Sequence, residues 1–146
     1  MSAPVPVLHA TLVTRHQAGD WRGVLLRGAS GVGKSDLALR LMADGWWLVA
    51  DDRVLVWTES GSLYGRAPAT LAGRIELRGQ GVEFENRWRD WSAIHLCIDC
   101  HPPGTILERV PEPRVATVLG VPLRLAQVTA CETSAVPRIN RLAQLP

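Results

Sequence analysis

A glycine-rich segment at residues 28–35 constrains the fold of this chain more than any other feature. It reads Gly-Ala-Ser-Gly-Val-Gly-Lys-Ser and matches the pattern G-x-x-x-x-G-K-[ST], in which backbone N–H groups surround a polyphosphate. Such a loop follows a strand and opens a helix, whose positive dipole end faces the anion. An apolar run at 23–27 precedes the segment, and apolar residues recur at three- and four-residue spacing over 35–43. We therefore expect a strand, a phosphate loop and a helix in that order.

The only lysine of the chain falls inside this segment. Among 16 Lys and Arg residues, all but Lys34 are arginine, which suggests that this position needs a compact ammonium rather than a planar guanidinium. In loops of this kind the lysine reaches the β- and γ-phosphates and the following hydroxyl, here that of Ser35, is offered to Mg²⁺. The residues expected to bind ATP are Gly28, Ala29, Ser30, Gly31, Val32, Gly33, Lys34 and Ser35.

Two adjacent aspartates form the second candidate feature. The apolar run at 46–50 has strand length and ends in Asp51 and Asp52. Because successive side chains of a strand point to opposite faces, the two carboxylates are not expected to share one role. One of them would orient metal-bound water, and the other would accept a proton from an incoming hydroxyl. The pattern alone leaves open which does which.

The remaining sequence indicates an α/β fold in which strands outnumber helices. A hydrophobic content of 47% and a charged content of 21% in 146 residues are typical of one globular domain, expected to span 1–146. The stretch at 102–113 is rich in proline and is expected to be a loop, and the tail from about 134 to 146 is expected to be weakly structured. Further strands are expected at 5–13, 54–57, 74–77, 93–98, 114–118 and 123–128.

Charge and hydropathy exclude several partners. The net charge of +2 comes from dispersed arginines rather than a basic stripe, so we expect no nucleic-acid partner. No apolar stretch reaches the length that spans a bilayer, and the first residues contain prolines without a basic leader. We therefore expect a cytoplasmic protein with no membrane association.

A cysteine–histidine motif is the main competing feature. Residues 97–101 match C-x-x-C-H, a pattern of haem attachment, and His95 adds a further candidate metal ligand. Haem attachment of this kind belongs outside the cytoplasm, and a zinc site would require Cys100 and His101 to fold back from a strand. We expect buried cysteines instead, and Cys131 leaves an odd number that argues against a disulfide framework.

Four segments together resemble the catalytic core of bacterial HPr kinase/phosphorylase. The segment at 75–82 is similar to that family's Glu-x-Arg-Gly-x-Gly block, although Gln80 stands where an apolar residue is usual. The segments are 28–35, 43–45, 48–54 and 75–82. The resemblance implies a P-loop kinase core with a mixed β-sheet, like the C-terminal domain of the family.

The resemblance also implies an activity and its residues. The family phosphorylates a serine of HPr, the phosphocarrier protein of the phosphotransferase system, with Mg²⁺ and ATP, removes this phosphate by phosphorolysis, and includes homo-oligomers. Asp52 would be the proton acceptor for the serine and the proton donor in the reverse reaction, and Lys34 would hold the phosphates. The resemblance implies His9 and Arg109 as further active-site groups, and Ser35 and Glu76 as groups at the metal. With Asp52 as the base, we expect Asp51 to have a supporting role near the metal.

Three other functions stay open on the sequence. A nucleotide-sensing module without catalysis would keep Lys34 and Ser35. It would have no use for Asp52 together with Arg109. A redox or metal protein would be built on Cys97 and Cys100, and a small-metabolite kinase would need a lid that so short a chain does not offer. The longer members of the family carry an N-terminal domain and C-terminal helices, which are absent here, so phosphorolysis is less strongly implied than ATP binding.

Overall fold

The computed structural model describes residues 5–144, and its elements are mostly strands. The two helices are α1 (Lys34–Ala43) and α2 (Ala135–Ala143), and a short 3-10 turn, η1, covers Ala69–Leu71. The strands are β1 (Val7–Leu8), β2 (Ala10–Gln17), β3 (Asp20–Arg27), β4 (Trp47–Ala50), β5 (Val54–Glu59), β6 (Ser62–Arg66), β7 (Arg74–Leu77), β8 (Gly81–Phe84), β9 (Ser92–His101), β10 (Arg114–Val118) and β11 (Val121–Thr129).

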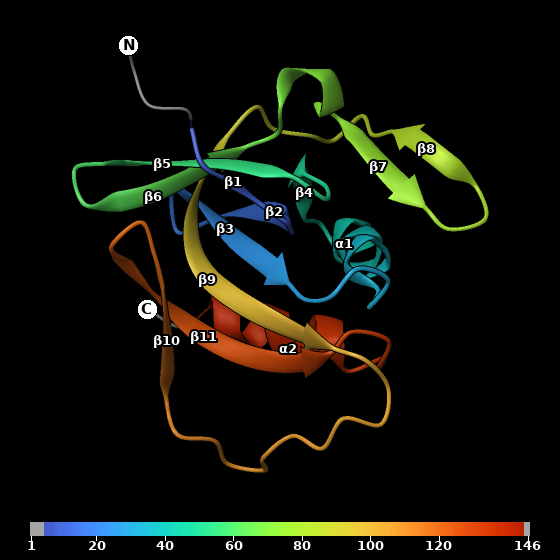
Figure 1. The fold of residues 1–146 in the computed structure, drawn as a ribbon, viewed down its shortest axis with the longest axis vertical. Helices are drawn as coiled ribbons and strands as arrows, with labels where there is room; N and C mark the ends of the chain where they lie inside the picture. Colours follow the sequence, from blue (N-terminus) through green and yellow to red (C-terminus); the bar gives the residue numbers. More distant parts are fainter. Residues whose placement is uncertain (1–4, 145–146) are drawn as a thin grey trace.

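Nine of the strands form one curled, mixed sheet (Figure 1). Its order is β1-β5-β6-β9-β3-β2-β4, and the far end of β9 also pairs with β11, which in turn pairs with β10. The strands β3, β9 and β11 run parallel to one another, whereas the other neighbours are antiparallel. The hairpin β7–β8 stands apart as a separate two-stranded sheet. The predicted α/β fold with a mixed sheet is confirmed.

The three parallel strands end at the same edge of the sheet. Ligands of α/β proteins bind at the carboxyl ends of such strands. At this edge β3 leads into the glycine-rich segment and β9 leads into the loop at 102–113 (Figure 1). The fold therefore presents the phosphate-loop candidate where the architecture expects a ligand.

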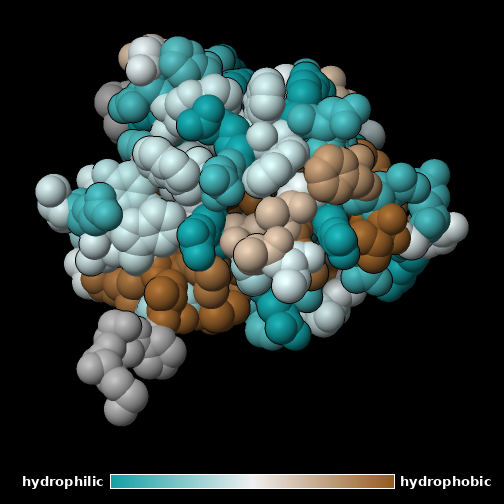
Figure 2. All heavy atoms as spheres, turned by 90° about the horizontal axis from the view of Figure 1, so that it is seen from above, coloured by the Kyte–Doolittle hydropathy of each residue, from teal (hydrophilic) through white to brown (hydrophobic). Residues whose placement is uncertain are grey.

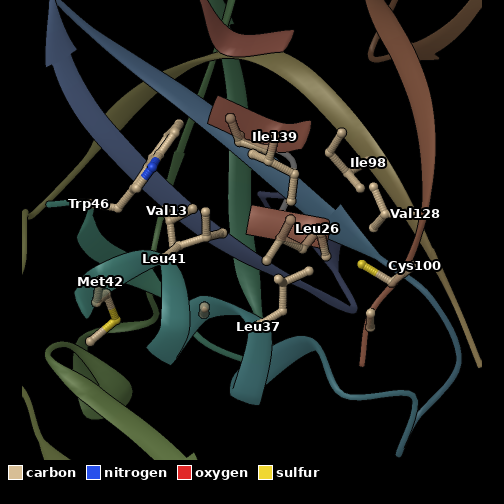
Figure 3. Packing of buried hydrophobic residues seen from close by; sticks show 14 of the residues in the cluster. Val13, Leu26, Leu37, Leu41, Met42, Trp46, Ile98, Cys100, Val128 and Ile139 are labelled. Atoms are coloured by element: carbon tan, nitrogen blue, oxygen red, sulfur yellow. The ribbon is translucent and has the colours of Figure 1, made fainter. Parts of the chain in front are cut away.

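Both helices cover one face of the sheet, and their packing fixes where α1 begins. Leu37 and Leu41 of α1 are fully buried, as is Ile139 of α2 (Figure 3). They pack in one cluster with Leu26 of β3 and Ile98 of β9. Burying a side chain of this size contributes about 1.5–3 kcal/mol, so this cluster holds the amino end of α1 against the end of β3.

A second cluster fills the other face, where β5 and β6 curl over the sheet. Leu12, Leu25 and Cys97 point from β2, β3 and β9 toward Val56 and Leu63 of the curled hairpin. Gly65 of β6 lies where an added Cβ would be 2.8 Å from Leu12, so the close approach of the two layers requires glycine.

The outer surface mixes both kinds of residue. On the face shown in Figure 2, hydrophilic residues predominate and hydrophobic residues gather in separate areas. Neither of the helices within residues 5–144 has the length and apolar content needed to cross a membrane.

The structure corrects two expectations about the ends of the chain. The strand expected at 5–13 is divided at His9, because β1 pairs with β5 whereas β2 pairs with β3 and β4. The tail expected to be weakly structured from 134 onward contains α2, with Ala135, Ile139 and Ala143 buried at four-residue spacing. The last part of that expectation, residues 145–146, lies outside the described residues.

Candidate active site

The phosphate-loop candidate forms a tight turn directly before α1. The N–H of Val32 donates to the carbonyl oxygen of Ala29 at 3.1 Å, and Gly31 and Gly33 have φ of +82° and +108°. These values favour glycine, because a side chain at positive φ is strained. Gly28 also has no room for a side chain, since an added Cβ would be 2.7 Å from the carbonyl oxygen of Cys100. The segment is thus a tight turn whose conformation and close packing both require glycine, as expected for a phosphate loop.

Lys34 is the first residue of α1 and points back across this turn. Its Nζ donates to the carbonyl oxygens of Gly28 at 2.6 Å and Ala29 at 3.1 Å. The ammonium therefore lies over the loop rather than over the protein core. It is placed to exchange these carbonyl partners for phosphate oxygens.

Asp51 is the most heavily hydrogen-bonded carboxylate of the site. It is only 6% exposed, and its Oδ1 accepts a hydrogen bond from the Ser35 hydroxyl at 2.7 Å. The same oxygen accepts from Thr11 Oγ1 at 2.9 Å, and Oδ2 accepts from the backbone N–H of Glu76 at 3.0 Å. A buried carboxylate needs such donors to offset the loss of water. Asp51 therefore joins β2, α1 and β7 behind the phosphate loop.

Asp52 has a different environment because the backbone turns sharply at this residue. The N–H of Arg53 donates to the carbonyl oxygen of Asp51 at 2.8 Å, and Asp52 between them has φ of +68°. A hydrogen bond between residues i and i+2 across a positive φ is the pattern of the rarer, strained γ-turn. Asp51 therefore faces inward, whereas the side chain of Asp52 is 59% exposed. Backbone strain of this kind is concentrated at functional sites.

A cavity of about 770 Å³ brings most of the predicted residues together. It lies between the phosphate loop, the first turns of α1 and the tip of the β7–β8 hairpin. Lys34, Ser35, Asp52 and Glu76 line it. His9 lies beside this group, with its Nδ1 3.9 Å from Oδ1 of Asp52, although both side chains are well exposed.

Arg109 is not brought into this cavity. It is an exposed residue in the loop at 102–113, whereas the hairpin β7–β8 that closes the cavity extends from the other side of α1 (Figure 1). The arginine that does line the cavity is Arg78, at the hairpin tip. An added Cβ on Gly31 would lie 3.8 Å from Nη2 of Arg78, so this guanidinium faces the phosphate loop.

Thr11 and Arg78 were missed as site residues by sequence reasoning. Arg78 lies inside the 75–82 segment and is charged, so the sequence does carry a signal for it. Thr11 carried none, because threonine is common in strands for its β-branched shape alone. Its contact with Asp51 joins residues 40 positions apart and becomes visible only in the fold.

The cysteine–histidine motif does not form a metal site. Cys97 and Cys100 lie on opposite faces of β9, each buried in a different hydrophobic cluster. His101 contacts Gln127 through its Nε2. Among residues 5–144, no three His, Cys, Asp or Glu side chains are grouped to hold a metal ion without other ligands. The expectation of buried cysteines is confirmed for Cys97 and Cys100, whereas Cys131 is exposed.

One of the three thiols is expected to react with a thiol reagent in the folded protein at pH 8. Burial raises the pKa of Cys97 to about 11 and that of Cys100 to about 12, so both stay protonated and shielded. Cys131 is exposed and should react alone. Titration with a chromogenic disulfide should give one rapid equivalent natively and three in denaturant, and Cys131→Ser should abolish the rapid one. Two rapid equivalents would contradict this burial.

The strained turn at Asp52 predicts an unusual order of stability. We expect Asp52→Gly to have a free energy of unfolding about 0.5–1 kcal/mol above that of Asp52→Ala, because glycine adopts φ of +68° without the Cβ clash, which outweighs its greater loss of chain entropy. The neighbouring exposed Arg53, whose φ is not positive, is the matched control, and there glycine should be the less stable of the two. Chemical denaturation of the four variants measures both differences. Equal stabilities at position 52 would show an unstrained turn.

Comparison with known proteins identifies a family for more than half of the chain. The family model of the HPr serine kinase C-terminal domain matches residues 3–86. The chain belongs to this family. An HPr kinase/phosphorylase from Streptococcus thermophilus is 42% identical over 83 residues, which is 52% of this chain and 27% of that protein. An HPr kinase/phosphorylase from Exiguobacterium sibiricum is 43% identical over 81 residues, which is 55% of this chain and 25% of that protein.

A solved structure extends the similarity beyond the matched sequence. The HPr(Ser) kinase/phosphatase from Coxiella burnetii superposes with a TM-score of 0.76 at 26% identity, covering 94% of this chain and 97% of that chain. By contrast, the match to this chain spans only about a quarter of the length of each of the two sequence relatives. Arg109 lies outside the residues that the family model matches, so its role stays a prediction.

Proposed function

We propose that the chain is a Mg²⁺- and ATP-dependent serine kinase that acts on HPr. The observation that carries this proposal is the separation of the two aspartates. Asp51 is buried against the hydroxyl of Ser35, whereas Asp52 is free to meet an incoming group in the cavity that also holds Lys34. The HPr kinase/phosphorylases to which the chain is similar supply the identity of the acceptor protein.

The proposed transfer uses Asp52 as the general base. The serine oxygen of HPr attacks the γ-phosphorus, its proton passes to the Asp52 carboxylate, and the bond between the γ-phosphorus and the bridging oxygen breaks to release ADP. Lys34 and the N–H groups of the phosphate loop hold the phosphates during this step. Phosphoryl transfer depends mainly on such positioning and charge neutralisation, so the site does not need a covalent intermediate.

Two residues that line the cavity, Ser35 and Glu76, together with Asp51 behind them, fit a magnesium ion. Ser35, Asp51 and Glu76 offer the hard oxygen atoms that Mg²⁺ prefers, and its remaining ligands usually come from water and substrate phosphates. The ion would neutralise charge on the β- and γ-phosphates when bound.

The same residues can serve the reverse reaction. Inorganic phosphate held by the loop would attack the phosphoserine phosphorus, and protonated Asp52 would return its proton to the departing serine oxygen. Pyrophosphate and unmodified HPr would be released. We include this phosphorolysis in the proposal because it requires no residue beyond those that the forward reaction uses.

Phosphoserine formation on HPr tests the proposal directly. The protein is incubated with ATP, Mg²⁺ and HPr from the same organism, and HPr is analysed by mass spectrometry for a single phosphoserine. Inorganic phosphate is then added without ATP, and pyrophosphate is measured. Nucleotide binding without any phosphoserine would contradict the kinase and favour the nucleotide-sensing module.

A further inference from the structure

Thr11 contributes a buried hydroxyl to the wall of the cavity. The residue lies near the start of β2, its exposure is 0%, and its Oγ1 donates to Oδ1 of Asp51 at 2.9 Å. A threonine hydroxyl has one proton, and here that proton is directed at the carboxylate. No part of the reaction described above uses this group.

The carboxylate that Thr11 contacts controls two other cavity residues. Oδ1 of Asp51 also accepts a hydrogen bond from the hydroxyl of Ser35 at 2.7 Å. Because this bond uses the only hydroxyl proton of Ser35, the lone pairs of the serine oxygen stay available to the cavity. Oδ2 receives the backbone N–H of Glu76 at 3.0 Å, and Glu76 lines the same cavity. A change in the rotamer of Asp51 would therefore disturb both Ser35 and Glu76, whose oxygen atoms are the proposed ligands of the magnesium ion.

We propose that Thr11 is a positioning residue for the metal end of the phosphate cavity. Its hydroxyl holds Asp51 in the rotamer that orients Ser35 and Glu76 toward the ion. This inference rests on the proposed function, because it assigns Thr11 a part in Mg²⁺-dependent nucleotide binding. Groups that orient the ligands of a metal typically change its affinity about 10- to 100-fold when they are removed.

Strand β2 supplies a matched control residue. Thr14 is also 0% exposed, and its Oγ1 shares a hydrogen bond of 2.8 Å with the hydroxyl of Ser92, not with a carboxylate. Replacing either threonine by valine keeps the β-branched shape and removes one buried hydroxyl. Both valine variants should therefore lose comparable stability, and only the variant at Thr11 should affect the metal.

The test measures binding of a non-hydrolysable ATP analogue by calorimetry over a series of Mg²⁺ concentrations. For Thr11→Val we expect the Mg²⁺ concentration at half-maximal binding to rise about tenfold or more. Thr11→Ser, which keeps the hydroxyl, and Thr14→Val should stay within about twofold of the wild type. Thr11→Ala gives the same reading if the valine variant does not fold.

Three results would overturn the inference in distinguishable ways. A Thr11→Val or Thr11→Ala protein with wild-type Mg²⁺ dependence removes the positioning role and leaves the proposed function intact. An equal shift in Thr14→Val would assign the effect to general destabilisation of β2. A wild-type protein that binds no nucleotide at any Mg²⁺ concentration would refute the proposed function itself, and this inference with it.

Discussion

Asp52→Asn should still bind ATP with Mg²⁺ and should lose about 10²- to 10⁴-fold in the rate of phosphate transfer to HPr. Removal of a general base typically has this effect, because the incoming hydroxyl then has no acceptor for its proton. Asparagine tolerates positive φ better than most residues, so the turn with φ of +68° should persist. Single-turnover rates at saturating nucleotide, with phosphoserine as the product measured, separate the loss of chemistry from a loss of binding.

Asp51→Asn is the informative comparison, because its carboxylate has a different environment. An amide at this position keeps only one oxygen to accept the three hydrogen bonds that Thr11, Ser35 and Glu76 now donate. This variant should lose stability and Mg²⁺-dependent nucleotide binding, whereas Asp52→Asn should lose rate alone. If Asp52→Asn transfers phosphate at the wild-type rate, Asp52 is not the base.

The local parts of the site could be predicted from sequence because their physics is local. The phosphate loop depends on glycines at fixed spacing, and positive φ at Gly31 and Gly33 agrees with that requirement. The different orientations of Asp51 and Asp52 were expected from strand alternation. In the structure they come instead from a turn that begins where β4 ends, which alternation in a strand does not describe.

The distant parts of the site could not be predicted in the same way. Which arginine lines the cavity depends on where the β7–β8 hairpin packs, and only that packing brings Arg78 opposite Gly31. Arg109 follows a long strand that ends at the same edge as the phosphate loop, but its own loop is fixed by no local pattern. Sequence spacing does not encode either placement.

The helix near the carboxyl end shows a different limit. Ala135, Ile139 and Ala143 have helical spacing, but the segment also contains Pro137, which usually indicates the end of a helix. Here Pro137 falls in the first turn of α2, where the missing N–H has no intrahelical acceptor to lose. The signal for a helix is therefore present in the sequence, and Pro137 stands in the one part of a helix that accepts proline.

Lys34→Ala is expected to lose most of the affinity for ATP while the fold is retained. Among the described residues the ammonium hydrogen-bonds to two loop carbonyl oxygens, so its removal should change the free energy of unfolding little. Toward a bound polyphosphate it would be one half of a hydrogen-bonded charge pair, and truncating such a pair costs about 2–5 kcal/mol where the ligand buries it, or roughly 30- to several thousand-fold in affinity.

Lys34→Arg distinguishes the role of shape from that of charge at this position. All the remaining Lys and Arg residues of the chain are arginine, so a requirement for charge alone would be met by arginine here as well. A guanidinium is planar and wider than the ammonium that now lies 2.6 Å from the carbonyl oxygen of Gly28, inside a loop with no room for a Cβ at Gly28. We therefore expect Lys34→Arg to bind ATP nearly as poorly as Lys34→Ala in calorimetry, with both variants unfolding at close to the wild-type temperature. Wild-type affinity in Lys34→Arg would show that the loop selects only a positive charge, and wild-type affinity in Lys34→Ala would show that the nucleotide phosphates lie elsewhere.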